Sequence, residues 1–306
     1  VIDVGTNSVK LLVAEVSGRS VRPLVEKSEQ TRLGRGFYET HRLQHEAIQK
    51  TAQAIAHFAA EAAQWQTASI RVVATSAARD AVNQAELLEA IRQAAGLATE
   101  VISGEQEADW VFAGVTTDPE LAAQPLLILD VGGGSTEFIL GQDTAQYFRQ
   151  SFRLGTVRLL EAMPHSDPPT ASEWEICRDH LRNFLEKQIR PVLEPALKAR
   201  APHPIQLVGT GGTTAILARM HLKLDTFDRD RIEAVRLDLE EMQRVQKHLW
   251  SLPLAERKRL VGLPPNRADV ILMGVAIFAT VMEQFGLSVL RTSTRGLRFA
   301  AVMDAV

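Results

Sequence analysis

Cysteine is nearly absent from this chain, since Cys177 is the only one among 306 residues. A single thiol supports neither a disulfide framework nor a thiolate metal site, which excludes a disulfide-stapled secreted module. A reducing cytoplasm is therefore the expected compartment. Long hydrophobic runs are also missing. The longest, residues 270–282, is too short to span a bilayer and is typical of a buried helix, so we expect no membrane association.

An excess of basic residues is missing as well. The formal net charge is −3, from 34 Lys and Arg against 37 Asp and Glu. Proteins that bind nucleic acid without specificity are usually basic, so we expect no nucleic-acid partner. If the ligand is a polyanion, its positive contacts must be local. The length allows two domains with real cores, and a hydrophobic content of 45% is typical of an ordinary folded protein.

One short motif occurs twice. Asp3-Val4-Gly5-Thr6-Asn7-Ser8 returns in the second half as Asp130-Val131-Gly132-Gly133-Gly134-Ser135, each time between two β-rich runs. This pattern predicts a hairpin whose turn exposes backbone N–H groups, with glycine removing the side chain that would block an anion. Two such turns predict a phosphate chain gripped from both sides of a cleft. The candidate phosphate-binding residues are Gly5, Thr6, Asn7, Ser8, Gly132, Gly133, Gly134, Ser135 and Thr136.

The aspartate of each motif would repel phosphate unless a cation lay between them. Mg²⁺ is the expected ion, with Mn²⁺ as an alternative, and Asp3, Asp130 and Glu137 are its candidate ligands. Lys10 occupies the repeat position equivalent to Glu137, which predicts that Lys10 also faces the anion. The simpler alternative is that both aspartates only form turns, although two such turns in register argue against chance.

Strand clusters alternate with helical patterns, which predicts an α/β protein of two similar lobes with a cleft between them. We expect the lobes at residues 1–118 and 119–296, with a boundary in the polar segment 116–125 and the terminal helix 297–306 completing the first lobe. Residues 75–80 are predicted to be a loop, and the helix beginning near 171 to end near Pro191 and Pro195. Asn266 is predicted to be the N-cap of an apolar helix at 268–285.

A third glycine-rich stretch follows a predicted strand. Its residues Gly209, Thr210, Gly211, Gly212 and Thr213 are predicted to bind phosphate at the start of a helix. The alternative is that the strand-to-helix turn alone requires these glycines.

Four further strings now bring a family into view. Thr75-Ser76-Ala77-Ala78-Arg79-Asp80, Ile102-Ser103-Gly104-Glu105-Gln106-Glu107-Ala108, Leu154-Gly155-Thr156-Val157-Arg158 and Pro265-Asn266-Arg267-Ala268-Asp269-Val270-Ile271 accompany the repeated motifs in order along the chain. Together they resemble the Ppx/GppA family of exopolyphosphatases and guanosine pentaphosphatases, in its short two-domain form. That family belongs to the superfamily of actin, sugar kinases and heat-shock chaperone ATPases, so the resemblance implies two actin-like (ribonuclease H-like) lobes.

The resemblance also implies roles for individual residues. Asp130 and Glu137 match the acidic metal-site positions, and Glu107 matches the catalytic carboxylate that positions or deprotonates the attacking water. Gln106 stands where the family has an acid, which leaves Glu105 as an alternative to Glu107. Arg79 matches an arginine at the cleft rim. The simpler alternatives are that Glu105 and Glu107 only favour the helix dipole, and that Arg79 makes a surface ion pair.

The implied activity is Mg²⁺-dependent hydrolysis of the terminal phosphoanhydride of inorganic polyphosphate. Hydrolysis of pppGpp at its 5′ end is the close alternative, and the Gly209 stretch could then serve a guanosine. A small-molecule kinase of the same superfamily and a non-catalytic nucleotide-dependent assembly protein are more distant alternatives. A homodimer is expected by analogy with the family.

Overall fold

The computed structural model describes residues 1–200 and 202–304. The first lobe is built on a five-stranded mixed sheet of order β3-β2-β1-β4-β5. Its strands are β1 (Ile2–Val4), β2 (Val9–Ser17), β3 (Ser20–Glu29), β4 (Val72–Ala74) and β5 (Thr99–Val101). Its helices are α1 (Phe37–Thr40), α2 (His45–Gln64), α3 (Ser76–Asp80), α4 (Gln84–Ala95) and α5 (Gly104–Val115). The sheet brings the turn after β1 to one end of the lobe.

The second lobe repeats this plan on a six-stranded sheet of order β10-β11-β9-β6-β7-β8. Its strands are β6 (Leu126–Val131), β7 (Thr136–Gln142), β8 (Ala145–Phe152), β9 (Gln206–Thr210), β10 (Arg236–Asp238) and β11 (Val289–Thr292). Its helices are α6 (Pro119–Ala122), α7 (Thr156–Ala162), α8 (Ala171–Phe184), α9 (Arg190–Lys198), α10 (Gly211–Leu222), α11 (Arg229–Glu233), α12 (Leu239–Ser251), α13 (Leu254–Arg257) and α14 (Ile271–Phe285). The predicted α/β architecture of two similar lobes is confirmed.

Both faces of each sheet are covered, because alternate residues of one strand belong to different apolar clusters. On β2, Leu11 and Val13 pack with α2, whereas Leu12 packs with Phe299 of α15 (Leu297–Met303). On β6, Leu127 and Leu129 belong to the core of the second lobe, whereas Ile128 faces α5. Successive strand residues point to opposite faces, so a run of apolar residues fills two cores at once.

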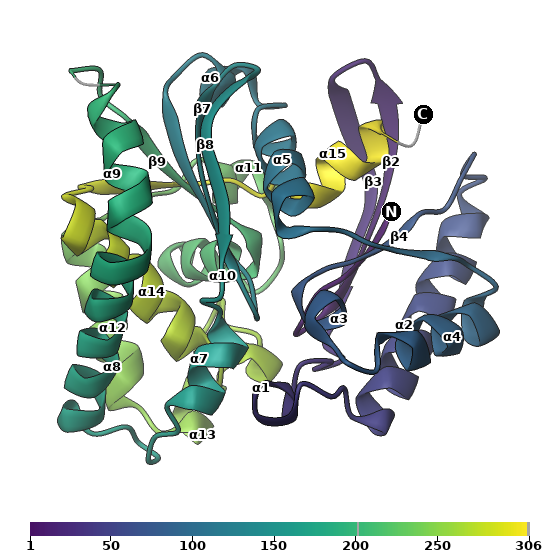
Figure 1. Ribbon diagram of the computed structural model, residues 1–306, viewed down its shortest axis with the longest axis horizontal. Helices are drawn as coiled ribbons and strands as arrows, with labels where there is room; N and C mark the ends of the chain where they lie inside the picture. The colour runs from purple at the N-terminus through teal and green to yellow at the C-terminus, as the bar shows by residue number, and fades with distance from the viewer. Residues whose placement is uncertain (201, 305–306) are drawn as a thin grey trace.

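Helices α5 and α15 join the two lobes. Figure 1 shows them crossing between the sheets, with the yellow α15 lying against β2 and β3. A single apolar cluster around Trp110 and Val111 of α5 includes Val73 of the first sheet and Ile128 of the second. The helices approach closely at Gly114, where a Cβ would overlap the Gly296 carbonyl oxygen. The two lobes are therefore joined through one closely packed apolar cluster.

Three local predictions were wrong. Residues 76–80 form α3 instead of a loop, and they carry Arg79 on its last turn. The helix from 171 continues past Pro191 through a π-helical turn, Leu185–Ile189, into α9, because Pro191 lies in the first turn of α9, where its missing N–H costs no hydrogen bond. Asn266 lies in a 3₁₀ turn, Pro265–Arg267, and α14 begins only at Ile271.

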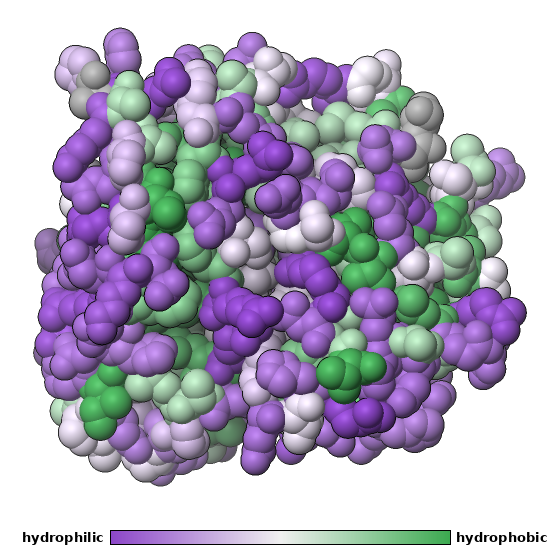
Figure 2. Space-filling model, in the orientation of Figure 1, coloured by the Kyte–Doolittle hydropathy of each residue, from purple (hydrophilic) through white to green (hydrophobic). Residues whose placement is uncertain are grey.

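The surface in Figure 2 is mostly hydrophilic, and its green residues form small patches separated by purple ones. Within residues 1–200 and 202–304, no helix has the length and apolar character needed to cross a bilayer. The most apolar helix, α14, is buried along Ile271 to Met282 inside the second lobe.

Candidate phosphate-binding cleft

The two repeated motifs form the same hairpin in each lobe. Asp3 lies opposite Lys10 in the β1–β2 pair, and Asp130 lies opposite Glu137 in the β6–β7 pair. The N–H of Gly5 donates to the Ser8 carbonyl oxygen at 3.0 Å, and the N–H of Gly132 donates to that of Ser135 at 3.0 Å. The predicted pair of hairpins is confirmed. Lys10 and Glu137 occupy equivalent positions in the two hairpins, each opposite the aspartate of its motif.

The peptide groups of the first turn are oriented by the loop after β3. The Gly34 N–H donates to the Thr6 carbonyl oxygen at 2.7 Å, and the Arg32 N–H donates to that of Asn7 at 3.0 Å. These bonds hold the carbonyl groups on one side of the turn. Over the part of the chain that the structure describes, the N–H groups of Thr6 and Asn7 donate to no other main-chain group. They remain available to an anion.

The start of α7 orients the second turn in the same way. The N–H groups of Thr156 and Val157 donate to the carbonyl oxygens of Gly132 and Gly133, each at 2.9 Å. Among the described residues, the N–H groups of Gly133 and Gly134 have no main-chain acceptor. Each lobe therefore presents free amides from a turn whose carbonyl groups are bonded outward.

The two turns face each other across one small cavity of about 80 Å³. Thr6 of the first turn lies against the second, because a Cβ on Gly133 would come within 2.9 Å of the Thr6 Cβ, and a Cβ on Gly134 within 2.9 Å of its hydroxyl. Only glycine allows this approach. The turns thus form the two sides of a shared site.

Four carboxylates line the same cavity: Asp3, Glu107, Asp130 and Glu137. Burial, together with the charge of Asp3, raises the pKa of Asp130 to about 6, against the lowering effect of Lys10. Burial also raises the pKa of Glu137 well above its usual value, and the charges of Glu107 and Asp130 act in the same direction. The cluster is therefore short of positive charge.

This donor set fits Mg²⁺. No three His, Cys, Asp or Glu side chains among the described residues lie close enough to hold an ion by themselves. Mg²⁺ usually keeps several waters and takes only one or two carboxylates together with phosphate oxygens, so an open cluster of buried carboxylates beside free amides suits it. A cage made only of protein groups would suit Ca²⁺ or Zn²⁺ better.

Glu107 lies in the first turn of α5 and points into the cavity. The N-cap of the helix is Ser103, whose side chain accepts a hydrogen bond from the Gln106 N–H at 3.1 Å. Burial raises the pKa of Glu107 to about 7, against the lowering effect of Arg79, whose Nη1 donates to Glu107 Oε2 at 3.0 Å. Glu105 is exposed and does not line the cavity. The structure thus places Glu107, and not Glu105, among the other site residues.

Comparison with known proteins identifies the family. The model of the Ppx/GppA phosphatase family matches residues 12–305. The chain belongs to this family. It is therefore a phosphoanhydride hydrolase, and its lobes have the actin-like fold of the superfamily.

Individual relatives are similar over most of the chain. Exopolyphosphatase 2 of Mycobacterium tuberculosis is 35% identical over 283 residues, which are 88% of this chain and 85% of that protein. The crystal structure of an exopolyphosphatase from Cytophaga hutchinsonii has a TM-score of 0.88 at 26% identity and covers 100% of this chain and 97% of its own. The Ppx/GppA enzyme of Aquifex aeolicus has a TM-score of 0.78 at 30% identity, with 99% and 97% covered.

The third glycine-rich stretch of this Ppx/GppA family member reaches the cleft only in part. Thr210, Gly211 and Gly212 line a larger cavity of about 420 Å³ that adjoins the small one. Gly211 has φ +87°, and a Cβ there would overlap the Asp130 carboxylate. The glycine is thus required both by the backbone conformation and by the Asp130 side chain at the end of the neighbouring strand β6.

Three predicted phosphate-binding residues are not brought to either cavity. Thr136 is buried, and its hydroxyl donates to the Leu154 carbonyl oxygen. Gly209 ends inside the sheet against Phe278, and Thr213 packs against Gly274 of α14. All three residues stand in or next to the glycine-rich motifs. Thr136 on β7 and Gly209 on β9 lie on the side of their strands that faces the core, and Thr213 lies on the buried side of α10.

The prediction from sequence missed Arg267. This arginine comes from the second lobe, lines both cavities, and its Nη1 donates to Ser8 Oγ of the first lobe at 2.8 Å. Burial lowers the pKa of Arg267 to about 10, so it stays charged at neutral pH. It stands in one of the strings that carried the family resemblance, but no helix or strand pattern indicated that it faces the cleft.

Proposed function

We propose that this enzyme is a Mg²⁺-dependent exopolyphosphatase, which releases orthophosphate from the ends of inorganic polyphosphate. The observation that carries the proposal is the pairing of two amide-presenting turns with four carboxylates around one cavity. The name of the Mycobacterium tuberculosis relative supports the substrate. Cationic side chains line the adjoining larger cavity and suit a polyanion that approaches the turns: Lys10, Lys27, Arg219, Arg267 and Arg298.

In the proposed reaction, Glu107 accepts a hydrogen bond from the attacking water and takes up its proton. The water attacks the terminal phosphorus in line with the bridging oxygen, and the remaining phosphate chain leaves. The free amides of the two turns, with Lys10 and Arg267, hold the non-bridging oxygens. Arg79 keeps Glu107 in place and favours its ionised form.

Asp3, Asp130 and Glu137 would hold Mg²⁺, directly or through its waters. When bound, the ion would neutralise charge on the phosphate oxygens and on these carboxylates.

A pH-dependent response to Mg²⁺ is expected from the raised pKa values. The pKa of Asp130 in the folded protein, about 6, lies above its ordinary value of 3.8. Without metal, protonated Asp130 therefore stabilises the fold at low pH, and this stabilisation is lost as the pH rises through about 6. Glu137 shifts in the same direction. Mg²⁺ binds the ionised carboxylates, so its stabilisation should be small at pH 5 and large at pH 8. At 100 times its Kd it should contribute about 2.7 kcal/mol.

Thermal melts with and without Mg²⁺ at the two pH values test this expectation. Asp130→Asn should show a smaller Mg²⁺-induced rise in Tm and a weaker dependence on pH. Asp143→Asn, in an exposed turn of the same lobe, is the matched control and should behave as the wild type. An equal rise at both pH values would argue against ion binding at these acids.

Hydrolysis of pppGpp is the second candidate, and the larger cavity carries the observation in its favour. Ile216, Phe227, Leu297 and Phe299 give that cavity an apolar lining beside the phosphate site. Apolar and aromatic surfaces are typical of organic ligands rather than of bare phosphate chains. Membership in a phosphatase family argues against the kinase alternative.

The experiment compares phosphate release from long-chain polyphosphate, tripolyphosphate, pppGpp and ATP at one Mg²⁺ concentration. The proposal expects the highest kcat/KM with polyphosphate. A higher kcat/KM with pppGpp, together with its loss in a Phe227→Ala variant, would favour the second candidate. ATP as the best substrate would contradict both.

A further inference from the structure

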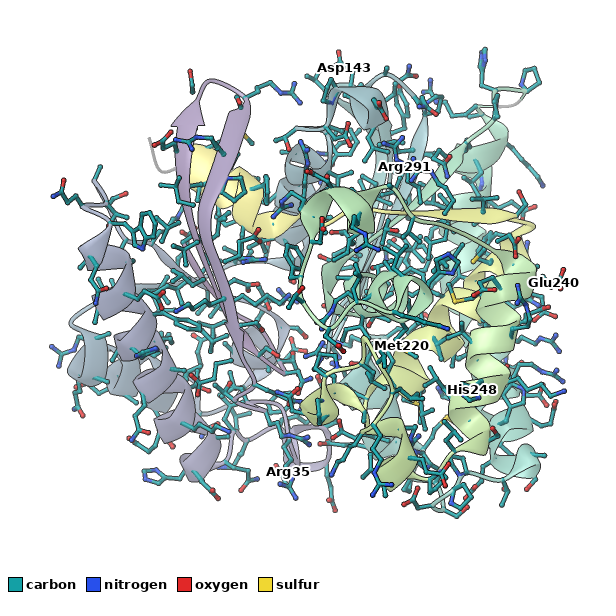
Figure 3. The ribbon with its side chains drawn as sticks, turned by 180° about the vertical axis from the view of Figure 1, so that it is seen from behind. Arg35, Asp143, Met220, Glu240, His248 and Arg291 are labelled. Atoms are coloured by element: carbon teal, nitrogen blue, oxygen red, sulfur yellow. The ribbon has the colours of Figure 1, made fainter. Side chains whose placement is uncertain are left out.

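The first lobe touches the second at the end of the cleft that lies beyond the paired turns. The loop before α1 meets α7 there, and Figure 3 shows Arg35 of this loop at the lower edge of the molecule. Glu161 of α7 accepts hydrogen bonds from the Gly36 N–H at 2.6 Å and from the Tyr38 N–H at 3.3 Å. One carboxylate of the second lobe therefore binds two main-chain N–H groups at the start of α1.

Tyr38 is also held through its ring. The Arg158 guanidinium lies over this ring at 4.1 Å, and its Nε donates to the Gly134 carbonyl oxygen at 2.8 Å. Phe37 is buried and meets Tyr38 edge to face at 5.1 Å. Asp80 pairs with Arg158 at 3.4 Å. A tyrosine of one lobe is thus clamped against a phosphate-binding turn of the other.

The Tyr38 hydroxyl lies directly behind the small cavity. A Cβ on Gly134 would come within 2.5 Å of Tyr38 Oη and of Ser76 Oγ, and within 2.9 Å of Thr6 Oγ1. The hydroxyl is buried beside Thr6 and makes no hydrogen bond of good geometry within the described residues. Burial raises the pKa of Tyr38 to about 12, so the phenol is neutral and adds no repulsion toward phosphate.

The two cavities show from which side a substrate reaches the turns. The small cavity shares Asp3, Ser8, Asp130 and Arg267 with the larger one, so the two are continuous. On the far side the small cavity is bounded by Thr6 and Ser76, with Tyr38 behind them. The small cavity, about 80 Å³, is much smaller than the larger one, about 420 Å³, so a phosphate chain bound between the turns has room to continue on the side of the larger cavity.

We propose that Tyr38, clamped by Arg158 and Glu161, forms the closed end of the phosphate channel and thereby restricts hydrolysis to chain ends. This inference rests on the proposed exopolyphosphatase function and assigns the residue that sets its specificity. With the channel closed, only a terminal phosphate can sit between the turns beside Glu107. An internal phosphate would need its chain to continue through the space that Tyr38 fills.

The test uses polyphosphate whose two terminal phosphates are capped as bulky phosphoramidates, next to the same chain uncapped. Each cut consumes one water: its oxygen bonds to one phosphorus, the bridging P–O bond breaks, and the protons go to the two new ends. Wild type should release phosphate from uncapped chains and leave capped chains intact. Tyr38→Ala should cut capped chains on the order of tenfold or more faster than wild type and yield products of intermediate length.

Two further variants complete the design. Tyr38→Phe keeps the ring and should leave capped chains intact, as in the wild type. Tyr147→Ala is the matched control, because Tyr147 of β8 also lies under an arginine, Arg200 at 3.4 Å, but packs against the core of the second lobe instead of against Gly134. If Tyr38→Ala lowers the Tm strongly, Tyr38→Leu replaces it, because leucine also removes the ring but keeps an apolar side chain. Hydrolysis of capped and uncapped chains is then compared in that variant.

Two negative results are distinct. If Tyr38→Ala or Tyr38→Leu hydrolyses uncapped chains and leaves capped chains intact, the closed end is overturned while the proposed function stands. If wild type releases no phosphate from uncapped chains, the proposed function itself is overturned.

Discussion

Glu107→Gln should lower kcat on polyphosphate by about 10² to 10⁴, with KM nearly unchanged. The amide keeps the volume of Glu107 and can still accept the Arg79 hydrogen bond, but it cannot take a proton from water. Phosphate binding by the two turns does not involve this side chain, so substrate affinity should be spared. Steady-state phosphate release at saturating Mg²⁺ measures both constants.

A stability measurement separates this chemical role from a structural one. Ionised Glu107 is disfavoured by burial, so a neutral amide should keep or raise the Tm of the metal-free protein. Glu105→Gln, two residues away on the exposed side of α5, is the matched control and should keep wild-type kcat. Near-normal turnover in Glu107→Gln, or an equal loss in Glu105→Gln, would remove Glu107 from the mechanism.

Gly155→Ala should produce the second large effect, through the backbone of the second turn. A Cβ at Gly155 would come within 2.5 Å of the carbonyl carbon and oxygen of Gly133 and 2.6 Å of the Gly134 carbonyl carbon. These atoms belong to the main chain and cannot move aside alone. The turn must shift, and a displacement of about 1 Å at a reacting group can cost on the order of 10²-fold in rate.

The same substitution should lower the free energy of unfolding by about 1–3 kcal/mol, as overpacking usually does. Kinetics and denaturant melts measure the two effects. Gly18→Ala is the control: it has nothing within 4 Å and φ +56°, so it should lose only about 1 kcal/mol from left-handed strain and keep its activity. A Gly155→Ala enzyme with normal rate and stability would show that the close contact between Gly155 and the second turn does not fix the position of that turn.

The repeated motif predicted the central part of the site, because it depends on local rules. An aspartate, a glycine-rich turn and alternating apolar residues determine a hairpin wherever they occur, and Asp3 opposite Lys10 follows from the register alone. Glu107 was indicated by the family resemblance, and the structure places it in the first turn of a helix capped by Ser103. The two-lobe architecture followed from the order of strands and helices.

The long-range parts were not predictable in this way. Arg267 lies in the 3₁₀ turn before α14 and reaches Ser8 of the other lobe, a contact that no local sequence pattern indicates. Tyr38 and Glu161 meet across the lobes, and neither stands in a pattern that marks a contact. The string around Gly155 contributed to the family resemblance. Position 155 requires glycine because the backbone approaches Gly133 closely, and only the three-dimensional structure shows this approach.

The central claim is that both turns grip one phosphate chain. A crystal structure with Mg²⁺ and an imido-bridged oligophosphate, which resists hydrolysis, tests it most directly. The account expects phosphate oxygens bonded to main-chain amides of residues 5–8 and 132–135 at once, with the ion beside Asp130. An analogue bound through one lobe only, or outside the cleft while both turns stay free of phosphate, would contradict it.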